Sequence, residues 1–349
     1  MPEVLRIALE VLIVFIVVFV VISMLMCKRG FDKAFPRADD DLTQTVTPRF
    51  EDFPDLAGEP VSFPCRGNTL KGYLFGPDDA PALVVAVHQM GGAIQNLLPV
   101  IDFLTRQGYE VLAFDCTGNH SSGGEGMSNP AQSVVDLDAA LTWVRSQPRL
   151  ATRPILLYGH SWGGYAATAI LGRHKGIAGA ISVAGYNSPL QMTYEDQKVK
   201  MNPSFGATIM YPFFWIELKR RAGAPFVRAV ESINKVTTPV LVIQGSEDRI
   251  LPPGASIYDQ RDKIKNPAVQ YLYREVPGQA GHLTLVNSKR AVVYQQDIPE
   301  LLEVNRAQVF TTRDVSTFWD SLDRRRANEL DSQVTAAIAR FCADALAKK

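Results

Sequence analysis

The chain has 349 residues, of which 46% are hydrophobic and 21% are charged, so it is long and apolar enough to bury a sizeable core. Lys and Arg together number 36, as do Asp and Glu, and this balance excludes the positive excess typical of proteins that bind nucleic acid. The cysteines form no CxxC pair and no residue cluster has the spacing of metal ligands, so neither a metal nor another cofactor is expected.

An apolar run, broken by a single serine, extends from Val11 to Cys27 near the start of the chain. At about 1.5 Å per residue, a helix of roughly 20 residues crosses the hydrocarbon core of a membrane. A cleaved secretory signal is the alternative, but such signals favour small residues before the cut, where this chain has Met24-Leu25-Met26. Residues 1–29 are therefore predicted to be a retained transmembrane anchor.

Basic residues around this run predict its orientation. Lys28, Arg29, Lys33 and Arg37 follow the run, whereas Arg6 alone precedes it, and an excess of Lys and Arg favours the cytoplasmic side. We therefore expect a single-pass protein of the cell membrane whose main domain lies on the cytoplasmic side.

Residues 30–60 contain Pro, Asp and Thr with little hydrophobic periodicity, which predicts a linker between the anchor and a domain at 61–349. That domain opens with a predicted hairpin, and apolar runs then alternate with amphipathic segments. This alternation predicts an α/β fold with a mostly parallel central sheet and helices on both faces. The strands are expected at Val61–Cys65, Leu70–Phe75, Ala82–Val87, Tyr109–Asp115, Ile155–Tyr158, Ala180–Ala184, Val240–Gln244 and Val269–Val276, and two of the helices at Asn96–Gln107 and Pro130–Ser146.

The segment Gly159-His160-Ser161-Trp162-Gly163 follows a predicted strand and precedes a predicted helix, which is the context of a nucleophile elbow. A serine hydroxyl attacks only when an imidazole takes its proton and a carboxylate orients that imidazole. Glu247 and Asp248 supply carboxylates at the end of a later strand, and His282 is the one histidine beyond them. The order serine, acid, histidine is the one expected for this elbow.

Acyl transfer also needs two backbone N–H groups aimed at the developing oxyanion. The N–H of Trp162, the residue after the nucleophile, is expected to be one of them. The other is expected at Met90, in the loop from His88 to Gly92 that follows an early strand. A simple glycine turn into a helix is the alternative interpretation of that loop.

Five motifs together resemble the α/β-hydrolase superfamily, in particular its esterase and serine-aminopeptidase-like branch. The resemblance implies an α/β-hydrolase fold and Asp248, rather than Glu247, as the acid of a Ser161, Asp248, His282 triad. The chain differs from the usual pattern at Gln89, where glycine is common, and at Thr117, where arginine is common. The motifs are His88-Gln89-Met90-Gly91-Gly92, Asp115-Cys116-Thr117-Gly118-Asn119-His120-Ser121-Ser122-Gly123, Gly159-His160-Ser161-Trp162-Gly163-Gly164, Gly245-Ser246-Glu247-Asp248 and Gly281-His282.

The insertion at 186–236 is too long for a simple crossover, and in the family that it resembles this position carries a lid. Met210, Phe213, Phe214 and Trp215 are therefore candidate residues for an apolar acyl pocket. The alternative is that these side chains form the core of the insertion itself.

These features predict a membrane-anchored serine hydrolase that cleaves carboxylic esters or thioesters through an acyl-enzyme on Ser161. The expected substrate is a small acyl ester or a lipid-like molecule, and no protein partner is identifiable. A serine peptidase of the aminopeptidase or prolyl-oligopeptidase type is the enzymatic alternative, because Gly-x-Ser-x-Gly-Gly-Tyr also resembles the elbow of those enzymes. A non-catalytic receptor or scaffold on the same fold is the third possibility.

Overall fold

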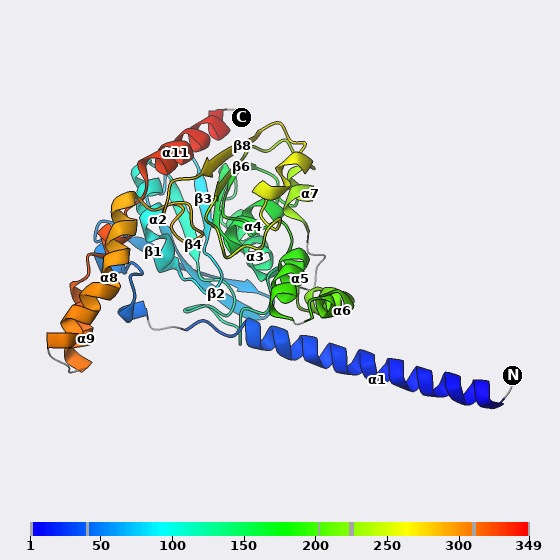
Figure 1. Cartoon of the computed structure of the whole chain (residues 1–349). Helices are drawn as coiled ribbons and strands as arrows, with labels where there is room; N and C mark the ends of the chain where they lie inside the picture. Colours follow the sequence, from blue (N-terminus) through cyan, green and yellow to red (C-terminus); the bar gives the residue numbers. More distant parts are fainter. Residues whose placement is uncertain (1–2, 40–41, 202, 223–226, 309–311, 348–349) are drawn as a thin grey trace.

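The computed structural model describes residues 3–39, 42–201, 203–222, 227–308 and 312–347, and within them eight strands form one sheet (Figure 1). The spatial order of the strands is β1-β2-β4-β3-β5-β6-β7-β8. The pairings of β1 with β2 and of β2 with β4 are antiparallel, and the remaining pairings are parallel, so the predicted mostly parallel sheet is confirmed. The strands are β1 Gly58–Cys65, β2 Asn68–Phe75, β3 Leu83–Val87, β4 Glu110–Phe114, β5 Ile155–His160, β6 Ile177–Val183, β7 Val240–Gly245 and β8 Val269–Arg274.

Helices connect the parallel strands and cover both faces of the sheet, as predicted (Figure 1). The α-helices are α1 Glu3–Ala34, α2 Leu98–Arg106, α3 Gln132–Ser146, α4 Trp162–Ala169, α5 Pro189–Lys200, α6 Phe205–Ala222, α7 Ala229–Ile233, α8 Lys289–Gln308, α9 Thr312–Ser321, α10 Arg324–Ala327 and α11 Ser332–Ala347. Short 3₁₀ helices are η1 Leu42–Gln44, η2 Phe50–Asp52, η3 Ile94–Leu97 and η4 Tyr258–Lys263.

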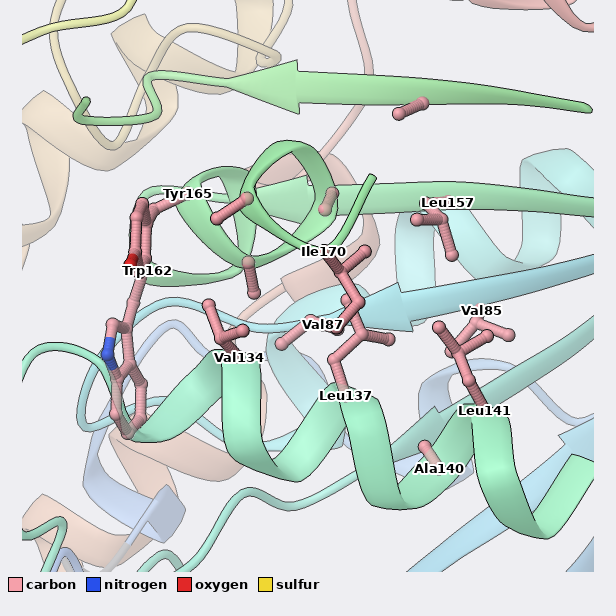
Figure 2. Close-up of a cluster of buried hydrophobic side chains, with 14 of the residues drawn as sticks. Val85, Val87, Val134, Leu137, Ala140, Leu141, Leu157, Trp162, Tyr165 and Ile170 are labelled. Atoms are coloured by element: carbon pink, nitrogen blue, oxygen red, sulfur yellow. The ribbon is translucent and has the colours of Figure 1, made fainter. Parts of the chain in front are cut away.

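Two apolar cores hold these layers together, because successive side chains of a strand point to opposite faces of the sheet. On one face Val85 packs with Leu137 of α3 and with Ile170, which follows α4 (Figure 2). On the other face Val84 belongs to a core that includes Phe341 of α11. The central strands are therefore buried on both sides, which explains why they read as continuous apolar runs.

The strand predicted at Ala180–Ala184 in fact begins at Ile177, and the reason lies at Gly179. A glycine in an apolar run usually indicates a break in a strand. Here, a Cβ at Gly179 would lie 3.1 Å from both Phe341 and Ala345, so the glycine allows α11 to pack closely on the sheet.

The helix α1 leaves the domain beside α6, and its second half, from Phe19 onward, packs on the rest of the chain (Figure 1). Among the described residues it is the one helix long and apolar enough to cross a membrane, with a mean hydropathy of 3.1 over an 18-residue window. A signal sequence near the N-terminus would meet the same criterion. At the other end of the helix, Cys27 and Phe31 are buried against Leu218 of α6.

The segment after α1 is fixed to the domain through most of its described length. The predicted boundaries at residues 29 and 60 do not coincide with element ends, since α1 continues to residue 34 and β1 begins at residue 58. Arg37 donates hydrogen bonds to the carbonyl oxygens of Ser122 (2.9 Å) and Gly124 (2.8 Å), and the N–H of Ala38 donates to the carbonyl of Gly118 (2.9 Å). The predicted linker is thus attached to the loop that follows β4.

Arg221, near the end of α6, joins α1 to the domain. Its guanidinium lies 2.6 Å from a carboxylate oxygen of the buried Glu217 and 2.5 Å from one of Asp32 on α1. It also donates to the backbone carbonyls of Lys28 (3.2 Å) and Ser128 (3.1 Å). One side chain therefore connects three segments of the chain.

We expect Arg221→Met to lower the free energy of unfolding by about 2 to 3 kcal/mol, the scale of lost hydrogen bonds to charged groups. The reason is that Glu217 keeps its burial but loses one of its two arginine partners. Lys219→Met is the matched control, because Lys219 lies two residues away and only stacks over the exposed ring of Trp215. Chemical unfolding of both variants would measure the difference, and equal losses would contradict a bridging role for Arg221.

Candidate active site

Ser161 lies in the turn between β5 and α4, at the carboxyl end of a central strand. Its φ of 55° is in the left-handed region, which non-glycine residues rarely adopt and which is expected of a nucleophile elbow. Backbone hydrogen bonds hold the turn on both sides. The N–H of Ser161 donates to the carbonyl of Val183 (2.7 Å), and the N–H of Tyr165 donates to the carbonyl of Ser161 (2.9 Å).

The glycines on either side of Ser161 are required by close backbone contacts. A Cβ at Gly159 would lie 2.0 Å from the carbonyl oxygen of Gly163, and a Cβ at Gly163 would lie 2.1 Å from the carbonyl oxygen of Val87. A larger residue at either position would therefore push apart β5, α4 and β3. The Gly-x-Ser-x-Gly spacing is thus explained by the packing of this turn.

The structure brings together the three side chains predicted as nucleophile, base and acid. His282 Nε2 lies 2.7 Å from Ser161 Oγ, and His282 Nδ1 lies 2.7 Å from Asp248 Oδ2. Asp248 follows β7, and His282 lies in the loop after β8, so three strands of one sheet, β5, β7 and β8, position the set. The side chains of Asp248 and His282 are both buried, which shields the hydrogen bond between them from water.

Asp248, and not Glu247, faces the imidazole. Its second oxygen accepts hydrogen bonds from the N–H groups of Ile250 (3.0 Å) and Leu251 (3.1 Å), while Glu247 accepts from the N–H of Gly278. Burial raises the pKa of Asp248, but the hydrogen bonds and the nearby imidazole outweigh it, so the net pKa lies below its ordinary value. The carboxylate is therefore charged at neutral pH, ready to stabilise a protonated His282.

His160, beside the nucleophile, is placed to position the base rather than to react. Its Nε2 lies 2.8 Å from the backbone carbonyl oxygen of His282, so this nitrogen carries a proton and donates it. Burial, together with the nearby ring of His282, lowers the pKa of His160 to about 4. The ring is therefore uncharged at neutral pH, and it holds the loop that carries His282.

This lowered pKa of His160 predicts how stability varies with pH. Between the ordinary value of 6.5 and about 4, the unfolded chain binds a proton at this residue and the native chain does not. The free energy of unfolding should therefore fall as the pH falls through this window, by up to about 3 kcal/mol at roughly 1.4 kcal/mol per pKa unit. Urea unfolding across this pH range should show a shallower fall for His160→Gln, and a fall as steep as that of the wild type would contradict the assignment.

The cysteines offer no competing nucleophile. All four are free and buried, and burial raises the pKa of the Cys65 and Cys342 thiols to about 12. A thiol reacts through its thiolate, so these side chains are inert at neutral pH. Within the described part of the chain, no three His, Cys, Asp or Glu side chains are grouped as metal ligands.

The loop after β3 is held in place by His88, which is fully buried. Its Nδ1 donates to the carbonyl of Gln89 (2.6 Å), and its Nε2 accepts from the N–H of Cys116 (2.9 Å). Burial lowers the pKa of His88, in keeping with a neutral ring that donates on one side and accepts on the other. Met90, in the same loop, lines the same cavity as Ser161 and Trp162.

That cavity has a volume of about 420 Å³ and lies over Ser161. Its size is within the range of about 300 to 1,000 Å³ found for small-molecule sites. Most of the wall is apolar, and the polar residues at its edge come from the last turns of α5. The wall is formed by Met26, Cys27, Gly30, Phe31, Ala34, Phe35, Met90, Pro130, Ser161, Trp162, Tyr186, Met192, Thr193, Asp196, Gln197, Lys200, Met201, Met210, Phe214, Ile250 and Leu251.

Two of the four predicted pocket residues of the insertion line this cavity, namely Met210 and Phe214. Phe213 does not, because its ring packs against Phe19 of α1 at a centroid distance of 6.0 Å. Trp215 does not either, because it is exposed and lies under the ammonium group of Lys219. Consecutive residues of a helix point about 100° apart, so residues 213, 214 and 215 cannot all face one cavity.

The insertion contributes both to the cavity wall and to the packing of the domain. Its helices α5 and α6 line the cavity, whereas α7 packs against α4, and Ala229 and Ile233 of α7 belong to the main core. Residues 202 and 223–226 of the insertion lie outside the described residues.

The sequence prediction missed the contribution of α1 to the cavity. Six of the wall residues come from positions 26 to 35, within and directly after this helix. A signal was present, since Cys27, Phe31 and Ala34 recur at helical spacing beyond the region needed to cross a membrane. Helical spacing indicates a buried face, but it does not reveal which part of the protein that face contacts.

The fold and the arrangement of Ser161, Asp248 and His282 are those of an α/β hydrolase. The chain therefore has an α/β-hydrolase fold. The profile of the family described as serine aminopeptidase, S33 (Hydrolase_4) matches residues 78–208, a segment that includes the elbow but neither the acid nor the histidine.

Relatives and solved structures agree with this placement. The uncharacterized protein YqkD of Bacillus subtilis (strain 168) is 23% identical over 282 residues, which cover 76% of this chain and 88% of that protein. The lysophosphatidylserine lipase ABHD12 of Danio rerio is 24% identical over 177 residues, covering 48% of this chain and 44% of the relative. A structure of the Pyrococcus furiosus esterase Pf2001 superposes with a TM-score of 0.53 at 19% identity, covering 82% of this chain and 98% of the esterase. These similarities support a hydrolase.

Proposed function

We propose that the chain is a membrane-anchored serine hydrolase that cleaves carboxylic esters or thioesters through an acyl-enzyme on Ser161. The observation that carries this proposal is the unbroken pair of 2.7 Å contacts from Ser161 Oγ to His282 and from His282 to Asp248. A serine hydroxyl becomes nucleophilic only where an oriented imidazole accepts its proton, and this geometry supplies that acceptor.

In the first half of the reaction, Ser161 Oγ forms a bond to the carbonyl carbon of the substrate while its proton passes to His282 Nε2. The bond from that carbon to the leaving oxygen or sulfur then breaks, and His282 returns the proton to the departing alcohol or thiol. In the second half, a water molecule gives a proton to His282 and attacks the acyl-enzyme. Collapse of this intermediate releases the carboxylic acid and returns the proton to Ser161.

The developing oxyanion in each half needs N–H donors. We assign these to the backbone N–H groups of Trp162 and Met90, two residues that line the same cavity as Ser161. Trp162 is the first residue of α4, so its N–H is among those at a helix N-terminus that lack a partner within the helix. Each such donor is worth roughly 3 to 4 kcal/mol in the transition state.

The apolar wall favours an acyl group over a peptide as the bound substrate. Asp196, an acidic residue in the wall, lies 2.8 Å from Lys200, so this carboxylate is paired and not free to hold a substrate amino group. A relative named as a lipase and a structural neighbour named as an esterase support the same choice. The match to the serine aminopeptidase profile is the observation that favours a peptidase as the second candidate.

Retention of α1 as an anchor is supported by its packing. A cleaved signal would leave the domain, whereas this helix buries Cys27 and Phe31 and forms part of the cavity wall. The excess of basic residues after the apolar run favours the cytoplasmic side for the catalytic domain.

A panel of substrates with one shared acyl group tests the reaction class. The purified full chain should hydrolyse the 4-nitrophenyl ester and the thioester, and mass spectrometry should detect the acyl group on the peptide that contains Ser161. Faster cleavage of aminoacyl amides than of esters would favour the peptidase. Failure of the native protein to react with any ester or with a fluorophosphonate probe would favour a non-catalytic scaffold.

A further inference from the structure

We propose that the last turns of α1 are a wall of the acyl-binding site and that the substrate is a long-chain acyl ester that enters from the bilayer between α1 and α6. This inference rests on the proposed hydrolase activity and adds the class and the source of its substrate. Its basis is the joint lining of the cavity over Ser161 by Met26, Gly30 and Phe31 of α1 and by Met210 and Phe214 of α6.

The position of α1 against the domain is specific. Cys27 and Phe31 are buried with Leu190 and Leu218 in one apolar cluster, and Arg221 ties the same turns through Asp32. An anchor that served only as a tether would need none of these contacts. The end of the helix is therefore held in a fixed relation to the nucleophile.

The helix α6 lies at the depth of the membrane if α1 crosses it. Phe213 of α6 contacts Phe19, which lies in the middle of the apolar run. Phe19 precedes Cys27 by eight residues, which is about 12 Å along a helix. On the outer surface of α6, Phe205, Ile209 and Ile216 are exposed at helical spacing. This exposed apolar stripe is then covered by lipid, because α6 packs beside the apolar run of α1 at Phe19.

The opening between the two helices then faces acyl chains rather than water. Met26 and Gly30 both line the cavity and are both exposed, so this part of the wall is also part of the surface. Gln197 and Lys200 of α5 add polar side chains to the wall of the same cavity, and Lys200 is exposed. An ester with its acyl chain in the bilayer and its polar part near the surface matches this arrangement.

Gly30 allows a sharp test, because a Cβ at this position would meet no atom within 4 Å. A large side chain there should fill the cavity from the α1 side without displacing the backbone. We expect Gly30→Phe, in the full chain in phosphatidylcholine proteoliposomes, to lower the kcat/KM for the palmitoyl ester about tenfold, since several methylenes lose their burial. The ratio of kcat/KM for the palmitoyl ester to that for the acetyl ester should therefore fall.

Leu25→Phe is the matched control, because Leu25 is exposed on α1 and is not among the cavity-lining residues. This variant should keep the chain-length profile of the wild type. If Gly30→Phe also keeps that profile while it labels normally, α1 is not a wall of the acyl site and the inference is wrong. If the wild type does not label at all, the proposed hydrolase activity fails instead.

A second measurement does not depend on how the variant folds. A phosphonate probe with a long alkyl chain that ends in a diazirine should react with the wild-type nucleophile and, after irradiation, crosslink to residues 26–35 or to α6. Crosslinks confined to other parts of the chain would overturn the proposed path of the acyl chain.

The path from the bilayer can be tested on the outer stripe of α6. Ile209→Asp should slow hydrolysis of a long-chain ester embedded in the vesicles several-fold and leave the soluble acetyl ester unaffected, because a charge at this position opposes insertion into lipid. An equal effect on both substrates, or none on either, would contradict delivery from the bilayer.

Discussion

Ser161→Ala is expected to abolish covalent labelling by a fluorophosphonate probe and to lower kcat for ester hydrolysis by about 10⁶, as when a catalytic serine is removed from a triad. The substitution removes the atom that would form the acyl bond, and no other side chain at the site supplies a nucleophile. The nearest alternatives, the cysteine thiols, are buried and protonated at neutral pH. Gel-based labelling and steady-state kinetics on the full chain measure both effects.

The fold should survive this change. The turn at Ser161 is held by its backbone N–H and carbonyl groups, which alanine retains. Ser133→Ala is a suitable control, because Ser133 is a buried serine whose hydroxyl donates only to the carbonyl of Trp162 (3.0 Å). Labelling of Ser161→Ala at the level of the wild type would show that another residue is the nucleophile.

Asp248→Asn is expected to lower kcat by about 10⁴ with little change in stability. The amide keeps an oxygen for the N–H groups of Ile250 and Leu251, so the loop remains supported. The NH₂ group would, however, face His282 Nδ1 as a donor, which favours the wrong tautomer and leaves a protonated imidazole without its counter-charge. The expected result is a loss in kcat that is much larger than any change in KM.

Glu247→Gln is the matched control, because the neighbouring carboxylate accepts a hydrogen bond from Gly278 and does not contact the imidazole. We expect its kcat to stay within a few-fold of the wild-type value. A large loss in the Glu247 variant and a small one in the Asp248 variant would reverse the assignment of the acid.

The strands of the sheet and the turn at Ser161 were predictable because each is encoded by neighbouring residues. Ser161, Asp248 and His282 were predictable as a group because each follows a predicted strand. The central strands read as apolar runs, since both of their faces are buried. Ser161 was identifiable from its two glycines, and the structure shows that these glycines avoid contacts of about 2 Å with backbone atoms. Asp248 and His282 follow strands that lie side by side, so the order serine, acid, histidine suggested that they meet, and the family resemblance selected Asp248 over Glu247.

What the sequence did not predict depends on contacts between distant segments. Arg37 binds backbone carbonyls of residues 122 and 124, and a carbonyl has no residue type that would reveal it as a partner. Only half of the pocket residues predicted on α6 line the cavity, because composition alone did not show which side of the helix faces α1 and which faces the cavity. For the same reason, α1 was interpreted as an anchor and not as a wall.

Because the end of α1 forms part of the cavity wall, loss of this helix would also change the shape of the cavity over Ser161. A protease that cut after Phe35 would remove six cavity-lining residues and Asp32, a partner of Arg221. The released domain would keep Ser161, Asp248 and His282 but would have a wider and more hydrated groove above them. If the proposed function holds, selectivity for chain length would be lost with α1 even where the chemistry persisted. The range of substrates would then show whether the domain still carries this helix.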